Sequence, residues 1–209
     1  DETMGAIEKI RSTVSSNVYA SGMSGVVTDI KNLALEEMPV YVVVASVLSL
    51  IVLLITMESV VSPLILLATI GISIVLNLGS NLFLGEISYI TQALAAVLQL
   101  AVTMDYSIFL LESYEANKLR YPGDNKRAMA HAIANTFKSV SSSSVTTIAG
   151  FIALCFMTFK LGTNIGVVMS KGVVIGVVAC VTILPAMILT FDKAIEKTSH
   201  KALIPSLDN

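Results

Sequence analysis

Long stretches without any charged residue are the feature that most limits how this chain can fold. No Asp, Glu, Lys or Arg occurs in the intervals 38–57, 59–85, 87–104, 139–159 and 172–191. Each interval is close to or above the ~20 residues that a helix needs to cross a hydrocarbon core about 30 Å thick. The core of a water-soluble protein does not repeat such stretches five times, so we expect five transmembrane helices in an all-α membrane protein.

The composition supports this class. The 209 residues are 55% hydrophobic and 13% charged, against roughly 25% charged residues in soluble domains. The net charge of −2 and the lack of a basic stripe with aromatic residues give no indication of nucleic-acid binding. Cys155 and Cys180 both fall inside expected spans, and we interpret them as packing residues and not as a disulfide or metal pair. We expect no metal site.

The expected helices divide the chain into five parts. Residues 1–38 are predicted to be the end of an extracytoplasmic domain, a short α/β remnant with an amphipathic helix near 4–14 and a strand over 18–27. Pro39 is an acceptable first-turn residue for the first span. Pro122 and Gly123 are expected to stop one helix, and Asp124 to cap the next. The remaining parts are three spans within 39–112 (about 39–57, 63–80 and 88–112), a cytoplasmic loop with an interfacial amphipathic helix at 113–140, two spans within 141–191, and a cytoplasmic tail at 192–209.

The distribution of lysine and arginine predicts the orientation. The loops near 81–88 and 160–171 hold only Lys160 and Lys171. The segment 113–140 and the tail hold many more: Lys118, Arg120, Lys126, Arg127, Lys138, Lys193, Lys197 and Lys201. Because basic residues accumulate on the cytoplasmic side, we expect the N-terminus outside and the C-terminus in the cytoplasm.

Asp105 stands inside the third expected span, with Glu86 and Glu112 as the nearest charged residues. A carboxylate at such a depth costs about 2.5 kcal/mol or more unless it is paired, hydrated or protonated. We therefore expect Asp105 to be a relay that takes up and releases protons, and so couples a proton gradient to a conformational change. Tyr106 follows about 100° further round the helix, where its hydroxyl could bond to another helix. The alternative is an aspartate that only anchors helix packing.

Other polar residues of the same helix are candidates for the proton path. Glu112 lies seven residues after Asp105, almost on the same face, although a solvated glutamate at a helix end is the alternative. Thr103, Ser107 and Gln99 could form hydrogen bonds near Asp105. The proton is then the coupling ion, and no other cofactor is expected.

Two protease hypotheses fail. No second aspartate lies within an expected span to share a proton with Asp105, as an aspartyl protease requires. The serine-protease-like "GMSG" at 22–25 lies outside the spans, and both histidines, His131 and His200, lie on the opposite side.

Small and hydroxyl residues concentrate in the last two spans. Gly162, Gly166 and Ser170 recur every four residues, as do Gly172 and Gly176. Such rows let helices approach closely, so we expect these glycines to lie in helix contacts. The hydroxyl-rich "SSSSVTTIAGF" at 141–151 is expected to bond to its own backbone or to a neighbouring helix.

Four segments together resemble the resistance–nodulation–division (RND) superfamily, in its MMPL branch. They are "TMDYSIFLLESY", "RAMAHAIANTFKSV", "SSVTTIAGFIAL" and "TILPAMIL". The resemblance implies an RND-type half bundle whose second to sixth helices are present here, with the first helix and most of an outer porter domain before residue 1. It implies that Asp105 and Tyr106 carry proton translocation, and that the relay residues of two halves face one another.

The same resemblance implies a function and partners. The function is proton-driven export of lipids, drugs or other amphiphiles from a bacterial cytoplasmic membrane, and not an enzyme reaction. The partners are membrane lipids, an amphiphilic substrate, and a second RND half or another copy of this half. A lipid-binding five-helix module like the sterol-sensing unit of related proteins is the alternative. The Asp-Tyr pair favours the exporter, because a sensor has no evident need for a titrating carboxyl.

Overall fold

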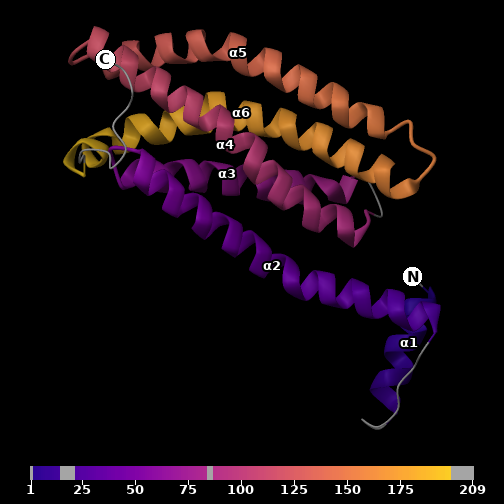
Figure 1. Ribbon diagram of the computed structural model, residues 1–209. Helices are drawn as coiled ribbons and strands as arrows, with labels where there is room; N and C mark the ends of the chain where they lie inside the picture. Colours follow the sequence, from indigo (N-terminus) through magenta and orange to yellow (C-terminus); the bar gives the residue numbers. More distant parts are fainter. Residues whose placement is uncertain (1, 15–21, 84–86, 199–209) are drawn as a thin grey trace.

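The computed structural model describes residues 2–14, 22–83 and 87–198, and these residues are almost entirely helical (Figure 1). No strand occurs among them. The strand expected over 18–27 is wrong from Met23 onward, because these residues form the first turn of a long helix; residues 18–21 lie outside the described part. The elements are α1 (Glu2–Thr13), α2 (Met23–Thr56), α3 (Val61–Gly79), the 3₁₀ helix η1 (Ser80–Phe83), α4 (Tyr89–Arg120), α5 (Asn125–Leu154) and α6 (Lys160–Lys197).

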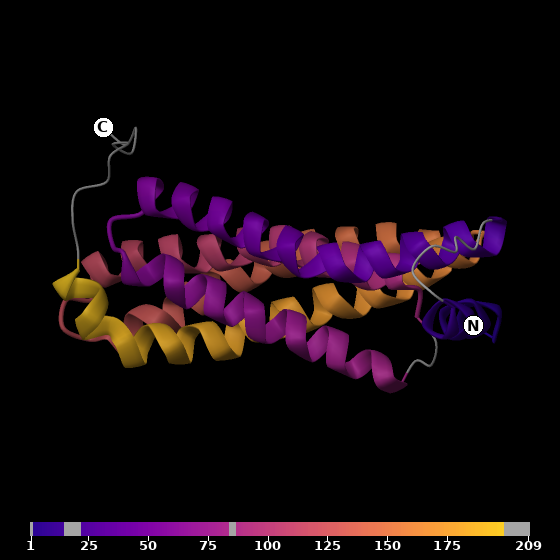
Figure 2. The same cartoon turned by 90° about the horizontal axis from the view of Figure 1, so that it is seen from below.

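Helix α6 lies at the centre of the bundle, where it packs against α3, α4 and α5. Figure 1 shows α5 and α2 on opposite sides of the molecule, with α2 diverging from the other helices toward α1, and Figure 2 shows the same bundle from below, with its helices running lengthwise. Helix α1 packs on α2, where Arg11 pairs with Asp29. We call the end with the connections 57–60 and 121–124 the Asp192 end, and the end with the connections 80–88 and 155–159 the Asn81 end.

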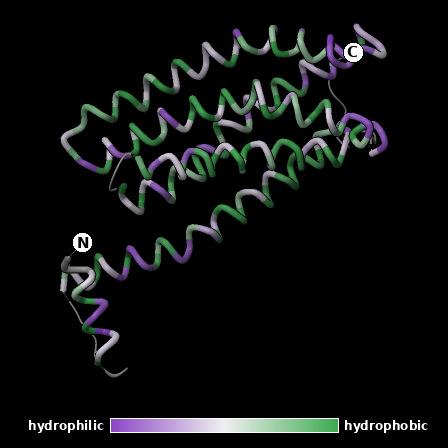
Figure 3. Tube along the Cα trace, turned by 180° about the vertical axis from the view of Figure 1, so that it is seen from behind, coloured by the Kyte–Doolittle hydropathy of each residue, from purple (hydrophilic) through white to green (hydrophobic). Residues whose placement is uncertain are grey.

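Four helices in the described part are long and apolar enough to cross a membrane: α2, α3 with η1, α4 from Ile90, and α6. The expected fourth span lies in α5, which has 30 residues but a more polar composition. Serines and threonines between Ser139 and Thr147 account for this difference. In Figure 3 the hydrophobic colour dominates the bundle, whereas hydrophilic residues gather in α1 and near the helix ends.

Four helices, namely α2, α4, α5 and α6, extend further than the charge-free intervals suggested. Pro39 does not begin a helix but lies inside α2. The expected loop at 160–171 is the first part of α6. The amphipathic segment after Asp124 does not form a separate interfacial helix, because α5 continues from it without a break to Leu154. Charged residues stop a helix from lying in hydrocarbon but not from continuing as a helix, so charge-free intervals underestimate helix length.

The turn between α4 and α5 follows the prediction. Helix α4 ends at Arg120, and Gly123 has φ +84°, a conformation that glycine adopts most readily. The Asp124 side chain accepts a hydrogen bond of 3.0 Å from the backbone N–H of Arg127 and so caps α5.

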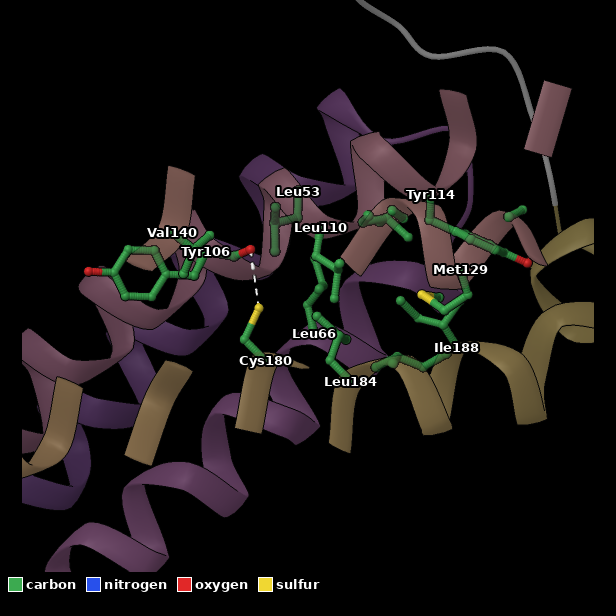
Figure 4. Packing of buried hydrophobic residues seen from close by; sticks show 14 of the residues in the cluster. Leu53, Leu66, Tyr106, Leu110, Tyr114, Met129, Val140, Cys180, Leu184 and Ile188 are labelled. Atoms are coloured by element: carbon green, nitrogen blue, oxygen red, sulfur yellow. Dashed lines mark hydrogen bonds between the residues drawn. The ribbon is translucent and has the colours of Figure 1, made fainter. Parts of the chain in front are cut away.

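The main hydrophobic cluster fills the space between α3, α4, α5 and α6 toward the Asp192 end (Figure 4). Leu66, Leu110 and Leu184 are fully buried there. Helix α2 contributes little to this core, since its buried residues are only Gly25, Thr28 and Leu53. The apolar side chains of α2 therefore need another apolar environment, which lipid supplies.

Candidate functional site

Asp105 lies in a pocket between α4 and α5. We call the side of the bundle onto which this pocket opens the open face. The Asp105 side chain is exposed, although it belongs to a membrane-spanning helix. The pocket has a volume of about 340 Å³. Helix α4 contributes Val102, Asp105, Tyr106 and Phe109, and helix α5 contributes Ser139, Val140, Ser143 and Thr147.

The carboxylate of Asp105 has no hydrogen-bond or ion-pair partner in the described part of the chain. The facing residues of α5 offer hydroxyl groups but no positive charge. Of these, the Thr147 hydroxyl already donates to the Ser143 carbonyl at 3.0 Å. A charged carboxylate in such a pocket requires water, a cation from outside this chain, or a proton.

Tyr106 is buried, with 4% of its surface exposed, and belongs to the main hydrophobic cluster. In Figure 4 its ring lies beside Val140, and its hydroxyl points away from Leu110 and Leu184. The Cys180 thiol donates to the Tyr106 backbone carbonyl at 3.3 Å, which ties α4 to α6 directly next to Asp105. The two residues of the predicted relay both line the pocket, but of the two only Asp105 has an exposed side chain.

The other proton-path candidates do not gather around Asp105. Glu112 is exposed on nearly the same face of α4, beyond the pocket residues. Gln99, Thr103 and Ser107 are all buried. Thr103 and Ser107 lie about 200° round the helix from Asp105, on the side that faces α3 and α6. The helical period of about 100° per residue places them there, so they could have been separated from Asp105 by sequence position alone.

Gln99 instead belongs to a buried amide cluster, which we define as Ser73, Asn77, Gln99, Lys171 and Gly172. The Gln99 side-chain amide donates to the Ser73 hydroxyl at 2.7 Å and to the Gly172 carbonyl at 3.3 Å, and it accepts from Asn77 at 2.8 Å. Lys171 donates to the Asn77 carbonyl at 3.0 Å. The cluster therefore joins α3, α4 and α6 inside the bundle.

The predicted packing glycines of α6 differ in what they contact. A methyl group on Gly172 would lie 2.5 Å from the Asn77 amide nitrogen, and one on Gly176 would lie 2.6 Å from the Thr103 hydroxyl oxygen. These two glycines make room for polar side chains. Gly162 and Gly166 face residues at the end of α5 and just beyond it, namely Met157, Phe151 and Cys155.

The hydroxyl-rich part of α5 divides between its own backbone and the open face. Thr146 and Thr147 donate to carbonyls four residues earlier, and Ser144 donates to Ser141. Ser142 and Ser143 are exposed. Both cysteines are free, and the described residues contain no group of three or more metal-ligating side chains.

Comparison with known proteins identifies relatives that match from about half to nine-tenths of this chain. The probable transport protein MmpL12 of Mycobacterium tuberculosis is 26% identical over 198 residues, which cover 90% of this chain and 17% of that protein. The siderophore exporter MmpL5 of the same species is 26% identical over 188 residues, which cover 87% of this chain and 19% of that protein. The putative membrane protein MJ1562 of Methanocaldococcus jannaschii is 30% identical over 97 residues, 46% of this chain and 24% of that protein.

No solved structure matches the chain. The chain spans less than a fifth of the length of MmpL12 and MmpL5. The MMPL family matches residues 1–204. With its apolar helices and its match over nearly all of its length, the chain belongs to the MMPL family of RND-type transporters.

Proposed function

We propose that this chain is the membrane-domain part of an MMPL-type exporter driven by the proton-motive force, and that Asp105 carries the proton. The observation that carries the proposal is the position of Asp105: a carboxyl on a membrane-spanning helix, exposed in a pocket and without a partner in the described part of the chain. Such a group is stable in hydrocarbon only when it is neutral, hydrated or paired, because an unpaired charge costs about 2.5 kcal/mol or more there.

This property can couple protons to movement. Protonated Asp105 tolerates an apolar environment, whereas ionised Asp105 favours water or a cation. Each state therefore favours a different packing of the open face, and proton uptake on one side and release on the other would drive the helices between the two packings. Tyr106, buried beside it, keeps this part of α4 attached to the bundle while the carboxyl remains free.

The open face is proposed to pack against a second half of the transporter or another copy of this half. Asp105, Ser139 and Ser143 line the pocket on it and are exposed, and polar groups of this kind are disfavoured against lipid. The chain covers less than a fifth of MmpL12 and MmpL5, which leaves room for a second half in proteins of that length.

A second pocket supports the proposal that the substrate is an amphiphile or a lipid. It is apolar, has a volume of about 480 Å³ and lies between the first half of α2 and the start of α4. Glu37 and the Tyr41 hydroxyl, joined by a hydrogen bond of 2.6 Å, are its polar groups. Its other lining residues are Ile30, Leu33, Ala34, Met38, Ile90, Ala93, Leu94 and Val97. This pocket fits the alternative function equally well, a lipid-binding module that senses and does not export.

The proposed location is a bacterial cytoplasmic membrane with the Asp192 end on the cytoplasmic side. The basic residues Lys118, Arg120, Lys126, Arg127 and Lys193 lie at or near that end, as the positive-inside rule requires.

Asp105→Asn in the full-length protein tests the proposal. In proteoliposomes with an imposed pH gradient, we expect substrate-dependent proton uptake to fall at least tenfold, because an amide does not exchange the proton. The matched control is Glu112→Gln, which neutralises an exposed carboxyl on nearly the same face of α4 and should retain most of the uptake. Unchanged uptake in Asp105→Asn would overturn the relay. Retained lipid binding with no uptake in the wild-type protein would favour the sensing module.

A further inference from the structure

A second cluster of polar side chains lies at the Asp192 end, outside the pocket. Asp192 is buried, with 6% of its surface exposed. Its carboxylate accepts hydrogen bonds from the Tyr114 hydroxyl at 2.9 Å, from the Lys118 ammonium at 2.9 Å and from the Asn125 amide. Lys118 also pairs with Glu196 at 2.7 Å. We call these five residues the Asp192 cluster.

The cluster draws its members from three helices. Tyr114 and Lys118 lie one turn apart on α4, and Asn125 is the first residue of α5. Asp192 and Glu196 lie one turn apart near the end of α6. A single carboxylate thus holds α4 and the start of α5 together, directly beside the four-residue turn that connects them. Every donor is directed at it, which satisfies a buried charge.

The same two helices form the walls of the Asp105 pocket. Tyr114 follows Asp105 by nine residues, about 14 Å along α4 at 1.5 Å per residue. Asn125 precedes Ser139 by fourteen residues, about 21 Å along α5. Both helices are continuous over these distances, so a change in their separation at the Asp192 cluster can be transmitted to the pocket walls, where hydrophobic packing between the two helices also acts.

We propose that Asp192 is a positioning residue for Asp105: by binding Tyr114 and Lys118 of α4 and Asn125 of α5, it sets the spacing of the two helices that enclose the relay carboxyl. The inference rests on the proposed function, because the spacing matters for transport only if Asp105 exchanges protons. A cluster that serves stability alone would leave the surroundings of Asp105 unchanged whenever the protein is folded.

The test reads the environment of Asp105 directly, in the full-length protein in membranes. A hydrophobic carbodiimide reacts with protonated carboxyls, and mass spectrometry of the peptide that contains Asp105 gives the extent of reaction at each pH. Within the described residues, Tyr106 is the one other titratable side chain that lines the pocket. Glu112 of α4 and Lys138 of α5 flank it in sequence, and neither residue is changed in the test.

For Asp192→Asn we expect the midpoint of the reaction to move by at least half a pH unit, together with a loss of proton uptake of about threefold or more. Tyr114→Phe removes one hydrogen bond and keeps the ring, so it should fold and shift the midpoint in the same direction by less. The matched control is Glu196→Gln, which alters the Lys118 pair but no bond to α5 and should leave the midpoint in place.

Unchanged midpoints in both folded Asp192→Asn and Tyr114→Phe would overturn the inference. If Asp192→Asn does not fold, Tyr114→Phe alone decides, by the same criterion. Failure of the proposed function looks different, because Asp105→Asn would then export normally whatever the Asp192 cluster does.

Discussion

Helix α4 carries polar residues on two faces, which differ in burial and in hydrogen-bond partners. Toward α3 and α6, Gln99 makes three hydrogen bonds and is 1% exposed. Toward the open side, Asp105 is exposed and has no partner in the described part of the chain. The Gln99 side chain thus finds its partners within this chain and holds helices together, whereas the Thr103 hydroxyl on the same face is buried without a partner in the described part. Asp105 has no such partners, and a carboxyl must be free in this way if it is to exchange protons or contact a second half.

The buried face should respond most strongly to mutation. Gln99→Leu is expected to lower the free energy of unfolding by about 2 kcal/mol, because Ser73 and Asn77 would stay buried with a lost partner, at about 1–3 kcal/mol for each unmade bond. Unfolding of the full-length protein by dodecyl sulfate in mixed micelles, followed by circular dichroism, measures the change. The control is Gln92→Leu, on the same helix but outside the amide cluster. Equal effects of the two substitutions would contradict the comparison.

Gly172→Ala should destabilise by about 1–2 kcal/mol, as overpacking of a filled interior does. The added methyl group would lie 2.5 Å from the Asn77 amide nitrogen and 3.2 Å from the Gln99 amide oxygen. Gly71→Ala in α3 is the matched control, because nothing lies within 4 Å of its methyl position. The control should be neutral or stabilise by up to about 1 kcal/mol. Thermal unfolding in detergent compares the two variants.

Gly176→Ala should destabilise by about 1 kcal/mol, and Thr103→Ala should restore most of the loss. The methyl group on residue 176 would meet the Thr103 hydroxyl at 2.6 Å and its methyl at 3.3 Å, and both groups are absent from alanine. A double-mutant cycle on the same unfolding assay gives the coupling energy. Additive effects would show that Thr103 is not the group that this glycine accommodates.

Asp105→Asn should have the smallest effect on stability, within about 0.5 kcal/mol, as for surface substitutions that break no interaction. The same variant is expected to lose proton uptake. The face with Gln99 would then serve stability, and the face with Asp105 would serve transport. A large loss of stability would instead indicate that Asp105 anchors helix packing, the alternative raised by its sequence context.

The helical membrane class followed from the charge-free intervals, and the cap at Asp124 from local turn chemistry. Helix ends did not follow, because Pro39 lies inside α2 and Lys171, whose ammonium donates to the Asn77 carbonyl, lies inside α6. The open position of Asp105 could have been separated from Gln99, Thr103 and Ser107 by the 100° period of the helix. The Asp192 cluster could not have been predicted from the sequence. Its members Tyr114, Asn125 and Asp192 come from three helices, and no local sequence pattern specifies how these helices are placed relative to one another.

Pro185 has a mechanical consequence for α6. At 38 residues this helix is about 57 Å long, nearly twice the ~30 Å hydrocarbon thickness, so it cannot lie wholly in the oily layer unless it is steeply inclined. Pro185 lies between Gly176 and Asp192 and lacks the N–H that would bind the Val181 carbonyl. Bending α6 therefore costs least energy at Pro185. The part of the helix that contains Gly172 and the part that contains Asp192 can change their relative angle there while each stays helical.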